Sequence, residues 1–142
     1  MSPRWEPNFD IRRGRTVVHP LHAHLGFTPR YRRGVFTDEL LRRCEEIMIE
    51  VCDRFGVRLV EFNGEHDQVH LLVCHPPKVA LPTLVNSLKG VSARLLRKDC
   101  SAHVRKYLWG GRFWSPSYFA ASCGGAPLSI IKEYIENQKR PD

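Results

Sequence analysis

Apolar residues recur every three or four positions in three segments of the chain, which predicts three amphipathic helices. The first predicted helix begins at Thr37, a residue suited to an N-cap, and ends at Gly56. The second extends from about Leu81 to Lys98, and the third from Pro127 to about Lys139, with proline in its first turn. Each helix therefore has an apolar face that a shared core can bury.

Shorter apolar runs lie between these helices and predict strands. The predicted strands are residues 17–27, 57–63, 68–75, 112–114 and 117–123. A turn at Gly64 joins the second strand to the third and suggests a hairpin. The order β-α-β-β-α-β-(β)-α is that of a split βαβ, ferredoxin-like domain with one added C-terminal helix. We therefore predict an α+β fold in which helices cover one face of an antiparallel sheet and the other face is available for a site.

The length of 142 residues fits a single domain, here residues 17–140, with no need of disulfides or metal for its stability. Residues 1–16 carry proline and arginine without periodicity and are expected to form a flexible basic arm. No run of about 18 apolar residues is present, and the N-terminus lacks the apolar centre of a signal peptide. The five cysteines are odd in number and lack C-x-x-C spacing, so we expect reduced thiols in a cytoplasmic protein without a membrane segment.

The net charge of +7 is unevenly distributed, because residues 34–75 are acidic overall and both flanking segments are basic. Most of the basic residues are arginines, whose planar guanidinium suits bidentate contacts with phosphate. The charge pattern therefore favours a nucleic acid as partner, although an ordinary solvated basic face has the same composition. The strongest candidates for phosphate contacts are Arg30, Arg32, Arg33, Lys89 and Arg94.

Four aromatic side chains near the basic segments are candidates for stacking on unpaired bases: Tyr31, Trp109, Phe113 and Trp114. Phe113 and Trp114 fit equally well the protein core or a dimer contact. An RNA-binding ferredoxin-like module is disfavoured, because its stacking aromatics would lie on the central strands, where this chain has His, Gln and Val.

The segment HDQVHLL, residues 66–72, combines a strand pattern with two histidines. Side chains alternate along a strand, so His66, Gln68 and His70 are predicted to point to one face. They form either the polar face of an antiparallel sheet or part of a metal site. Imidazole nitrogen and amide oxygen suit Mg²⁺ or Mn²⁺ better than zinc.

The last predicted helix places Tyr134 and Gln138 on one side, one turn apart. The pair is either a partly buried tyrosine with a surface glutamine, or a nucleophile with a neutral oxygen ligand beside it. A phenol attacks phosphorus poorly at neutral pH and needs a divalent cation to polarise the phosphate. The second interpretation therefore depends on the metal site in the strand.

Three motifs occur in order between about His22 and Gln138: EFNGEHDQVHLLV, PPKVALPTLVNSLKGVSARLLR and WSPSYFAASCGGAPLSIIKEYIENQ. With these motifs the chain resembles the single-tyrosine HUH transposases, TnpA-like enzymes of small bacterial and archaeal insertion sequences that are related to REP-associated tyrosine transposases. The resemblance covers nearly the whole chain. It implies a ferredoxin-like homodimer that recognises hairpins at element ends and nicks and rejoins single-stranded DNA.

The same resemblance implies the roles of individual residues. Tyr134 corresponds to the nucleophile, which forms a 5′-phosphotyrosine and frees a 3′-hydroxyl that later attacks such a link to rejoin strands. Mg²⁺ or Mn²⁺ polarises the scissile phosphate, and the metal-binding positions fall on Gln68, His70 and Gln138.

Gln68 departs from the family pattern, which has histidine at this position. A site with one imidazole is chemically feasible, since the Gln68 amide offers an oxygen, but we expect it to bind metal more weakly. His66 could partly compensate if the metal shifted towards it. His22-Ala23-His24 is a literal His-hydrophobic-His sequence on the first predicted strand. Its place in the fold argues against it as the metal motif, although both histidines could line the same sheet face.

Two functions therefore remain open. The first is an active transposase that uses Tyr134 and a divalent cation. The second is a decayed or co-opted relative that binds hairpin DNA and cleaves it weakly or not at all, because Gln68 replaces the first metal-binding histidine.

Overall fold

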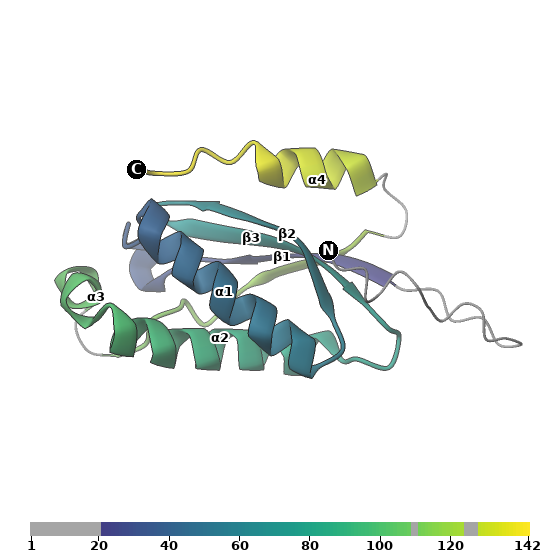
Figure 1. Cartoon of the computed structure of the whole chain (residues 1–142), viewed down its shortest axis with the longest axis horizontal. Helices are drawn as coiled ribbons and strands as arrows, with labels where there is room; N and C mark the ends of the chain where they lie inside the picture. Colours follow the sequence, from purple (N-terminus) through teal and green to yellow (C-terminus); the bar gives the residue numbers. More distant parts are fainter. Residues whose placement is uncertain (1–20, 109–110, 124–127) are drawn as a thin grey trace, which may run out of the picture.

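The computed structural model describes residues 21–108, 111–123 and 128–142, which form an α+β domain around a four-stranded antiparallel sheet (Figure 1). The strands are β1 (Leu21–Phe27), β2 (Arg58–Glu65), β3 (Gln68–His75) and β4 (Phe119–Ser122), in the order β2-β3-β1-β4. The helices are α1 (Asp38–Arg54), α2 (Leu81–Asp99), α3 (Ser101–Tyr107) and α4 (Leu128–Glu136), with a 3-10 turn at Arg30–Arg32. The predicted basic arm, residues 1–16, and Trp109 lie outside the described residues.

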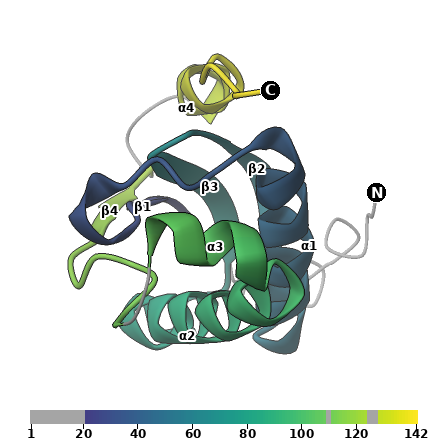
Figure 2. The same ribbon diagram turned by 90° about the vertical axis from the view of Figure 1, so that its left-hand side faces the viewer.

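The order of the strands in the sheet confirms the predicted ferredoxin-like arrangement. Helices α1 and α2 pack against one face of the sheet, and α4 lies across the opposite face (Figures 1 and 2). This second face was predicted to be available for a site. In the structure α4 covers part of it and packs on β2 and β3. The last helix therefore carries its side chains directly to the face on which a site was expected.

The main core lies between the sheet and helices α1 and α2. The buried side chains of α1 follow the helical period, and Thr37 caps the helix because its hydroxyl accepts a 3.2 Å hydrogen bond from the Leu40 N–H. Alternate residues of β3, namely Val69, Leu71 and Val73, point into this core and are fully buried. The alternation leaves the other side chains of β3 for the face under α4.

A second, smaller apolar cluster attaches α4 to the sheet. Leu72 of β3, Cys123 and Ile135 of α4 form it, and all three are buried. Leu128 and Ile131, the other members of the predicted apolar stripe, pack at its margin. Because this stripe faces the sheet, the rotation of α4 about its own axis is set by burial of these side chains.

The segment predicted as a strand at residues 112–114 is not one. Trp114 makes a single isolated bridge with Pro29, and the aromatic rings of this segment turn into the core. Phe113 and Trp114 expose only 1% and 3% of their surface, and the Trp114 indole N–H donates a 2.9 Å hydrogen bond to the Ser92 hydroxyl. The core interpretation of Phe113 and Trp114 is therefore confirmed, since buried rings cannot stack on bases.

The hairpin between β2 and β3 is tighter than the sequence analysis proposed. Strand β2 continues through Gly64 to Glu65, and His66 and Asp67 form the turn. The expectation that His66 shares a strand face with Gln68 is therefore wrong. The backbone pairs Gly64 with Val69, a close approach that a larger residue would obstruct.

Two helix boundaries also differ from expectation. Helix α3 was not predicted, because Val104 is its single buried residue and one apolar position sets no period. Helix α4 ends at Glu136, so that Gln138 follows the helix instead of belonging to its last turn. The Gln138 backbone N–H still donates to the Ile135 carbonyl, at 3.2 Å, which keeps the residue close to the helix end.

All five cysteines are unpaired in the structure, and four of them are buried. Among the described helices, none is both long and apolar enough to cross a bilayer.

Replacing Gly64 by alanine is expected to destabilise the hairpin. A Cβ atom at Gly64 would lie 2.5 Å from the Gln68 carbonyl oxygen and 3.0 Å from Leu41 Cδ2. Such overpacking costs roughly 1–3 kcal/mol, which chemical denaturation can measure as a lower free energy of unfolding. Gly90→Ala is the control, because a Cβ on this exposed glycine of α2 meets no atom within 4 Å and alanine favours the helix. Equal losses in the two variants would contradict this account of Gly64.

Candidate functional site

Two histidines and a tyrosine meet on the sheet face beneath α4. His24 comes from β1, His70 from β3 and Tyr134 from α4. His24 Nε2 lies 3.1 Å from His70 Nδ1, a hydrogen bond between the two rings. The Tyr134 ring centroid lies 5.5 Å from that of His70 and 5.8 Å from that of His24, in edge-on contacts. The phenol thus stands over a pair of imidazoles.

Gly26 explains why His70 reaches towards β1. The sheet register places Gly26 directly opposite His70, and a Cβ at this glycine would lie 3.3 Å from His70 Nδ1. The missing side chain leaves space for the His70 ring to lie over β1, where it meets His24. Phe119 of β4 closes the other side of His24, with ring centroids 5.1 Å apart.

The two imidazoles are electrically neutral near pH 7. Burial first, and then the neighbouring His24, lower the pKa of His70 to about 4, although Glu65 opposes the shift. Burial also lowers the pKa of His24. Neutral imidazole is the form that binds metal, because only then does a ring nitrogen keep a lone pair. His70 Nε2 is buried and has no hydrogen-bond partner among the described residues.

Two glutamines, one at the start of β3 and one just after α4, bond to each other. Gln68 Nε2 donates to Gln138 Oε1 at 3.1 Å and to Glu65 Oε1 at 3.3 Å. Gln138 Nε2 in turn donates to the Tyr134 carbonyl at 3.3 Å. The hydrogen bonds therefore connect the start of β3 to the end of the helix that carries the tyrosine.

Asn63 of β2 holds the C-terminal end of α4, a role that the sequence analysis missed. Its Nδ2 donates to the carbonyls of Ile135, in the last turn of α4, at 3.1 Å and of Gln138, just after the helix, at 3.3 Å. Arg140 donates to Asn63 Oδ1 at 3.1 Å and fixes the amide orientation. No local pattern could have revealed this contact, because it joins residues more than seventy positions apart.

Of the four residues that the resemblance selected, the structure places Gln68 against Gln138 and His70 against Tyr134, and Gln138 bonds the Tyr134 carbonyl. It adds His24, which contacts His70. His66 stands apart in the hairpin turn, where its ring packs against Gly34 and its carbonyl accepts from the Phe36 N–H at 3.1 Å. His22 lies on the same strand face as His24, two residues nearer the start of β1.

The donor types near Tyr134 could hold a hard divalent cation such as Mg²⁺ or Mn²⁺. No group of three or more His, Cys, Asp or Glu side chains in the described part of the chain is arranged to hold a metal. The available donors are one unpartnered imidazole nitrogen, His70 Nε2, and the amide oxygens of Gln68 and Gln138. Mg²⁺ and Mn²⁺ accept such oxygen-rich, partly hydrated environments. The buried nitrogen without a partner is the observation that supports the fit.

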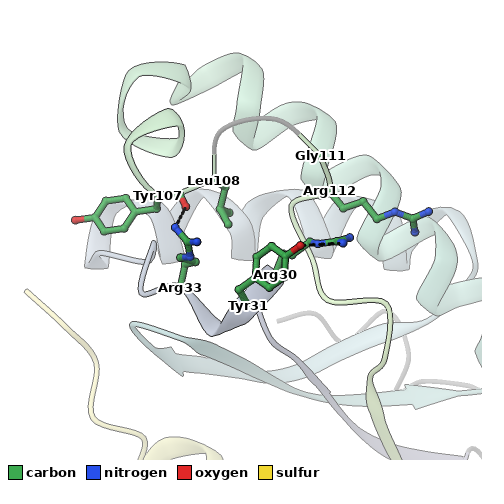
Figure 3. A pocket seen from close by; sticks show the side chains of 7 residues that line it. All are labelled: Arg30, Tyr31, Arg33, Tyr107, Leu108, Gly111 and Arg112. Carbon is green, nitrogen blue, oxygen red and sulfur yellow. Dashed lines mark hydrogen bonds between the residues drawn. The ribbon is translucent and has the colours of Figure 1, made fainter.

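A basic pocket of about 710 Å³ lies away from the imidazole pair. Its lining residues are Arg30, Tyr31, Arg33, Tyr107, Leu108, Gly111 and Arg112 (Figure 3). Figure 3 shows Tyr31 between Arg30 and Arg33, whose guanidinium carbons lie 4.9 Å and 5.7 Å from the centroid of its ring. The Tyr31 side chain is 71% exposed and lies in a cationic surrounding.

The backbone at this pocket is strained. Tyr31 has φ 60° and Arg32 has φ 53°, the left-handed region that non-glycine residues seldom adopt. Arg32 is held by an ion pair of 3.1 Å with Asp67 of the hairpin turn, and Arg33 donates to the Tyr107 carbonyl at 3.4 Å. These contacts hold the unusual turn that presents Tyr31.

The remaining two candidates for phosphate contacts lie on α2, in the layer on the far side of the sheet from α4. Lys89 donates to the carbonyls of Ser115 at 2.7 Å and Pro116 at 3.3 Å, and burial lowers its pKa. Its ammonium therefore anchors the segment after Trp114. Arg94 is exposed on α2. Their contacts with DNA stay predictions.

The likeness to solved structures defines a class of protein, namely small α+β transposases. The chain is similar to a putative transposase of known structure from Deinococcus radiodurans R1, with a TM-score of 0.71, 33% identity, and coverage of 92% of this chain and 99% of the other. It also shares its fold with a REP-associated tyrosine transposase solved with a REP hairpin, at a TM-score of 0.55 and 10% identity, over 89% of this chain and 69% of the other.

Sequence comparisons narrow this class to a family. Residues 17–138 match the family model described as "Transposase IS200 like". The chain is 31% identical over 129 residues to the ISDra2 transposase TnpA of Deinococcus radiodurans, covering 91% of each. It is 30% identical to the transposase for insertion sequence element IS200 of Salmonella typhimurium, covering 84% of this chain and 77% of the relative. The chain belongs to the IS200-like transposase family and is by this membership a DNA-processing enzyme.

The buried state of His70 predicts a loss of stability in acid. The unfolded histidine takes up a proton near pH 6.5, whereas the folded one resists protonation until about pH 4. The folded state therefore loses stability as the pH falls through this window. Melting temperatures measured from pH 7.5 to 4 should fall less steeply for His70→Gln, which cannot titrate. His66→Gln, which removes an exposed histidine of the turn, is the control and should keep the native slope. An unchanged slope in His70→Gln would contradict the prediction.

Proposed function

We propose that the protein nicks and rejoins single-stranded DNA at hairpin-bearing ends of an insertion sequence, through a 5′-phosphotyrosine on Tyr134 and with a divalent cation. The observation that carries this proposal is the position of Tyr134, which lies above His24 and His70 while 49% of its surface stays exposed. Membership of the IS200-like family supports the same chemistry. As in the family resemblance, we propose that the protein acts as a homodimer.

Tyr134 is suited to nucleophilic attack because its surroundings hold the ring without closing it off. The next residue, Ile135, is fully buried against the sheet, which fixes the direction in which Tyr134 points. Its exposed surface leaves an approach for a phosphodiester. Attack by the phenolic oxygen on phosphorus would form the phosphotyrosine and release the 3′-oxygen of the neighbouring nucleotide as a hydroxyl.

The cation would be held by His70 Nε2 together with the amide oxygens of Gln68 and Gln138. When bound, it would polarise the scissile phosphate and stabilise the charge that develops on the phosphate oxygens during attack. The protein's part is to keep His70 neutral through burial and to hold Gln138 next to the helix end through Asn63. Both features are present in the folded chain before DNA binds.

The Tyr31 pocket is proposed to bind the DNA at unpaired nucleotides. A base stacked on Tyr31 would have its neighbouring phosphates within reach of Arg30, Arg33 and Arg112. Single-strand binding proteins combine aromatic stacking with a basic surface in this way, because every base has a π-face and every linkage carries a charge.

A second candidate function is a relative that binds hairpin DNA without cleaving it. One observation favours it: the Gln68 amide already donates to both Glu65 and Gln138. A cation has to replace the hydrogen bond to Gln138, because the acceptor Oε1 of Gln138 is one of the proposed metal ligands. That competition predicts weak metal binding and slow cleavage compared with a site that has histidine at position 68.

Cleavage assays on three forms of the protein separate these functions. A labelled single strand with a hairpin is incubated with Mg²⁺ or Mn²⁺, and the covalent protein–DNA adduct is measured on denaturing gels. The native chain is expected to form an adduct, and Tyr134→Phe none, because it lacks the phenolic oxygen. Gln68→His is expected to lower the half-saturating Mn²⁺ concentration by roughly tenfold, equal to about 1.4 kcal/mol of added binding.

The outcomes differ for the two candidates. A native chain that forms no adduct, with Gln68→His active, would overturn the active enzyme and support the DNA-binding relative. Cleavage by Tyr134→Phe would show that another group is the nucleophile. Binding of the labelled hairpin strand, measured in the absence of metal, serves as the folding control for every variant.

Removing the stacking platform is expected to weaken DNA binding. Tyr31→Ala should raise the Kd for a single-stranded oligonucleotide by roughly tenfold, because stacking on one aromatic ring contributes about 1–3 kcal/mol per base. Arg30→Ala should weaken binding and reduce its salt dependence, since one phosphate contact is lost. The matched control is Arg42→Ala, an exposed arginine of α1 with the same charge change, in an ion pair with Asp38. Fluorescence anisotropy at several salt concentrations measures all three. Equal effects of Arg30→Ala and Arg42→Ala would argue against the pocket.

A further inference from the structure

His70 has two ring nitrogens in very different surroundings. Nδ1 lies 3.1 Å from His24 Nε2, and Nε2 is buried without a hydrogen-bond partner among the described residues. A neutral imidazole carries one proton, on one nitrogen or the other. The position of that proton decides whether Nε2 is a donor or offers a lone pair.

The contact with His24 can be made in two directions. If His70 Nδ1–H donates to His24 Nε2, then His70 Nε2 keeps its lone pair and can bind a cation. If His24 Nε2–H donates instead, the proton of His70 sits on Nε2, where the described residues offer no acceptor. Buried N–H groups without an acceptor are rare, because the lost hydrogen bond costs about 1–3 kcal/mol. Only the first direction makes Nε2 a metal ligand.

We propose that His24 is a positioning residue whose Nε2 accepts a hydrogen bond from the His70 Nδ1–H and thereby presents the lone pair of His70 Nε2 to the cation. The inference rests on the metal-dependent function proposed above and assigns a role to a histidine outside the family's metal motif. Partners of this kind fix the tautomer and ring orientation of metal-binding histidines, and their loss typically weakens metal binding 10- to 100-fold.

The surroundings of His24 favour a positioning role over direct binding of the cation. Its Nε2 faces His70 Nδ1, the nitrogen turned towards β1 and Gly26, and not the unpartnered Nε2. The ring is held between the Phe119, Tyr134 and His70 rings, with centroid distances of 5.1 Å, 5.8 Å and 5.2 Å. It is 8% exposed, so its orientation is set by packing.

The arrangement matters more in this chain because Gln68 leaves the site with a single imidazole from β3. His70 is then the one strand β3 residue that offers a nitrogen ligand to the site, and it can do so only in the Nδ1–H tautomer. Gly26 is part of the same arrangement, since a Cβ there would meet His70 Nδ1 at 3.3 Å.

The test measures the proton position directly in the full chain. Long-range ¹H–¹⁵N NMR of histidine-labelled, metal-free protein distinguishes protonated Nδ1 from protonated Nε2. We expect the native protein to carry the His70 proton on Nδ1. In His24→Phe, which keeps a packed ring but has no acceptor, His70 should shift to the Nε2–H form. In His24→Gln, whose amide oxygen can accept the bond, the Nδ1–H form should return.

Mn²⁺ binding, measured by calorimetry on the same proteins, gives a readout that does not depend on cleavage. His24→Phe should weaken binding at least tenfold, and His24→Gln should restore most of it. His22→Phe, a histidine on the same strand face, is the control and should change neither the His70 tautomer nor the affinity.

Three results would overturn the role of His24. They are a native His70 protonated on Nε2, a tautomer and affinity unchanged by His24→Phe, or a lowered affinity with an unchanged tautomer, which would make His24 a direct ligand. A native protein that binds no Mn²⁺ would count against the metal-dependent function, whereas the tautomer measurement would still decide the direction of the hydrogen bond.

Discussion

The burial of Ile135 against Leu72 and Cys123 is the contact on which the site depends. It attaches α4 to the face of the sheet opposite α1 and α2, and it sets the rotation of a helix of nine residues that has few other apolar contacts. Tyr134 precedes Ile135 in the chain, so the same packing that buries one side chain points the other at the imidazole pair. The Asn63 amide completes the attachment by bonding the carbonyls at the end of the helix.

Burial also determines the chemistry of the pair beneath the tyrosine. Removal of the His24 and His70 rings from water disfavours their charged forms, so both stay neutral where a free histidine would begin to take up protons. Neutral rings can share one proton between Nε2 and Nδ1 and keep a lone pair for a cation. The apolar surroundings thus keep the two imidazoles of the site in their neutral form.

In the function proposed here, the imidazole site and the Tyr31 pocket would divide the two tasks of a DNA-processing enzyme. The imidazole pair and Tyr134 lie on a sheet face, where strands and a packed helix fix their positions. Tyr31 lies on a strained turn after β1, with arginines around an exposed ring. Rigid elements suit a reaction that depends on geometry, and a loop surface suits contact with a partner of variable sequence.

The sequence by itself determined the elements that depend on local pattern. The helical period of α1 and α2, the limits of β3 and the order of the four strands with α1, α2 and α4 follow from it, because each is encoded within a short window. The resemblance added Gln68, His70, Tyr134 and Gln138, of which the structure pairs Gln68 with Gln138 and His70 with Tyr134. The unpredicted helix α3 has one buried residue and therefore no pattern to read.

Only the tertiary structure decided how distant segments meet. The contact of His24 with His70 depends on a glycine in the neighbouring strand, and Asn63 meets α4 across more than seventy residues. His66 lies in the turn and not in a strand, because β2 continues to Glu65 and the turn falls two positions later than predicted. Phe113 and Trp114 lie in the core, so packing against its side chains, and not strand alternation, sets where their rings point. Such features arise from packing between elements, which no single window of sequence contains.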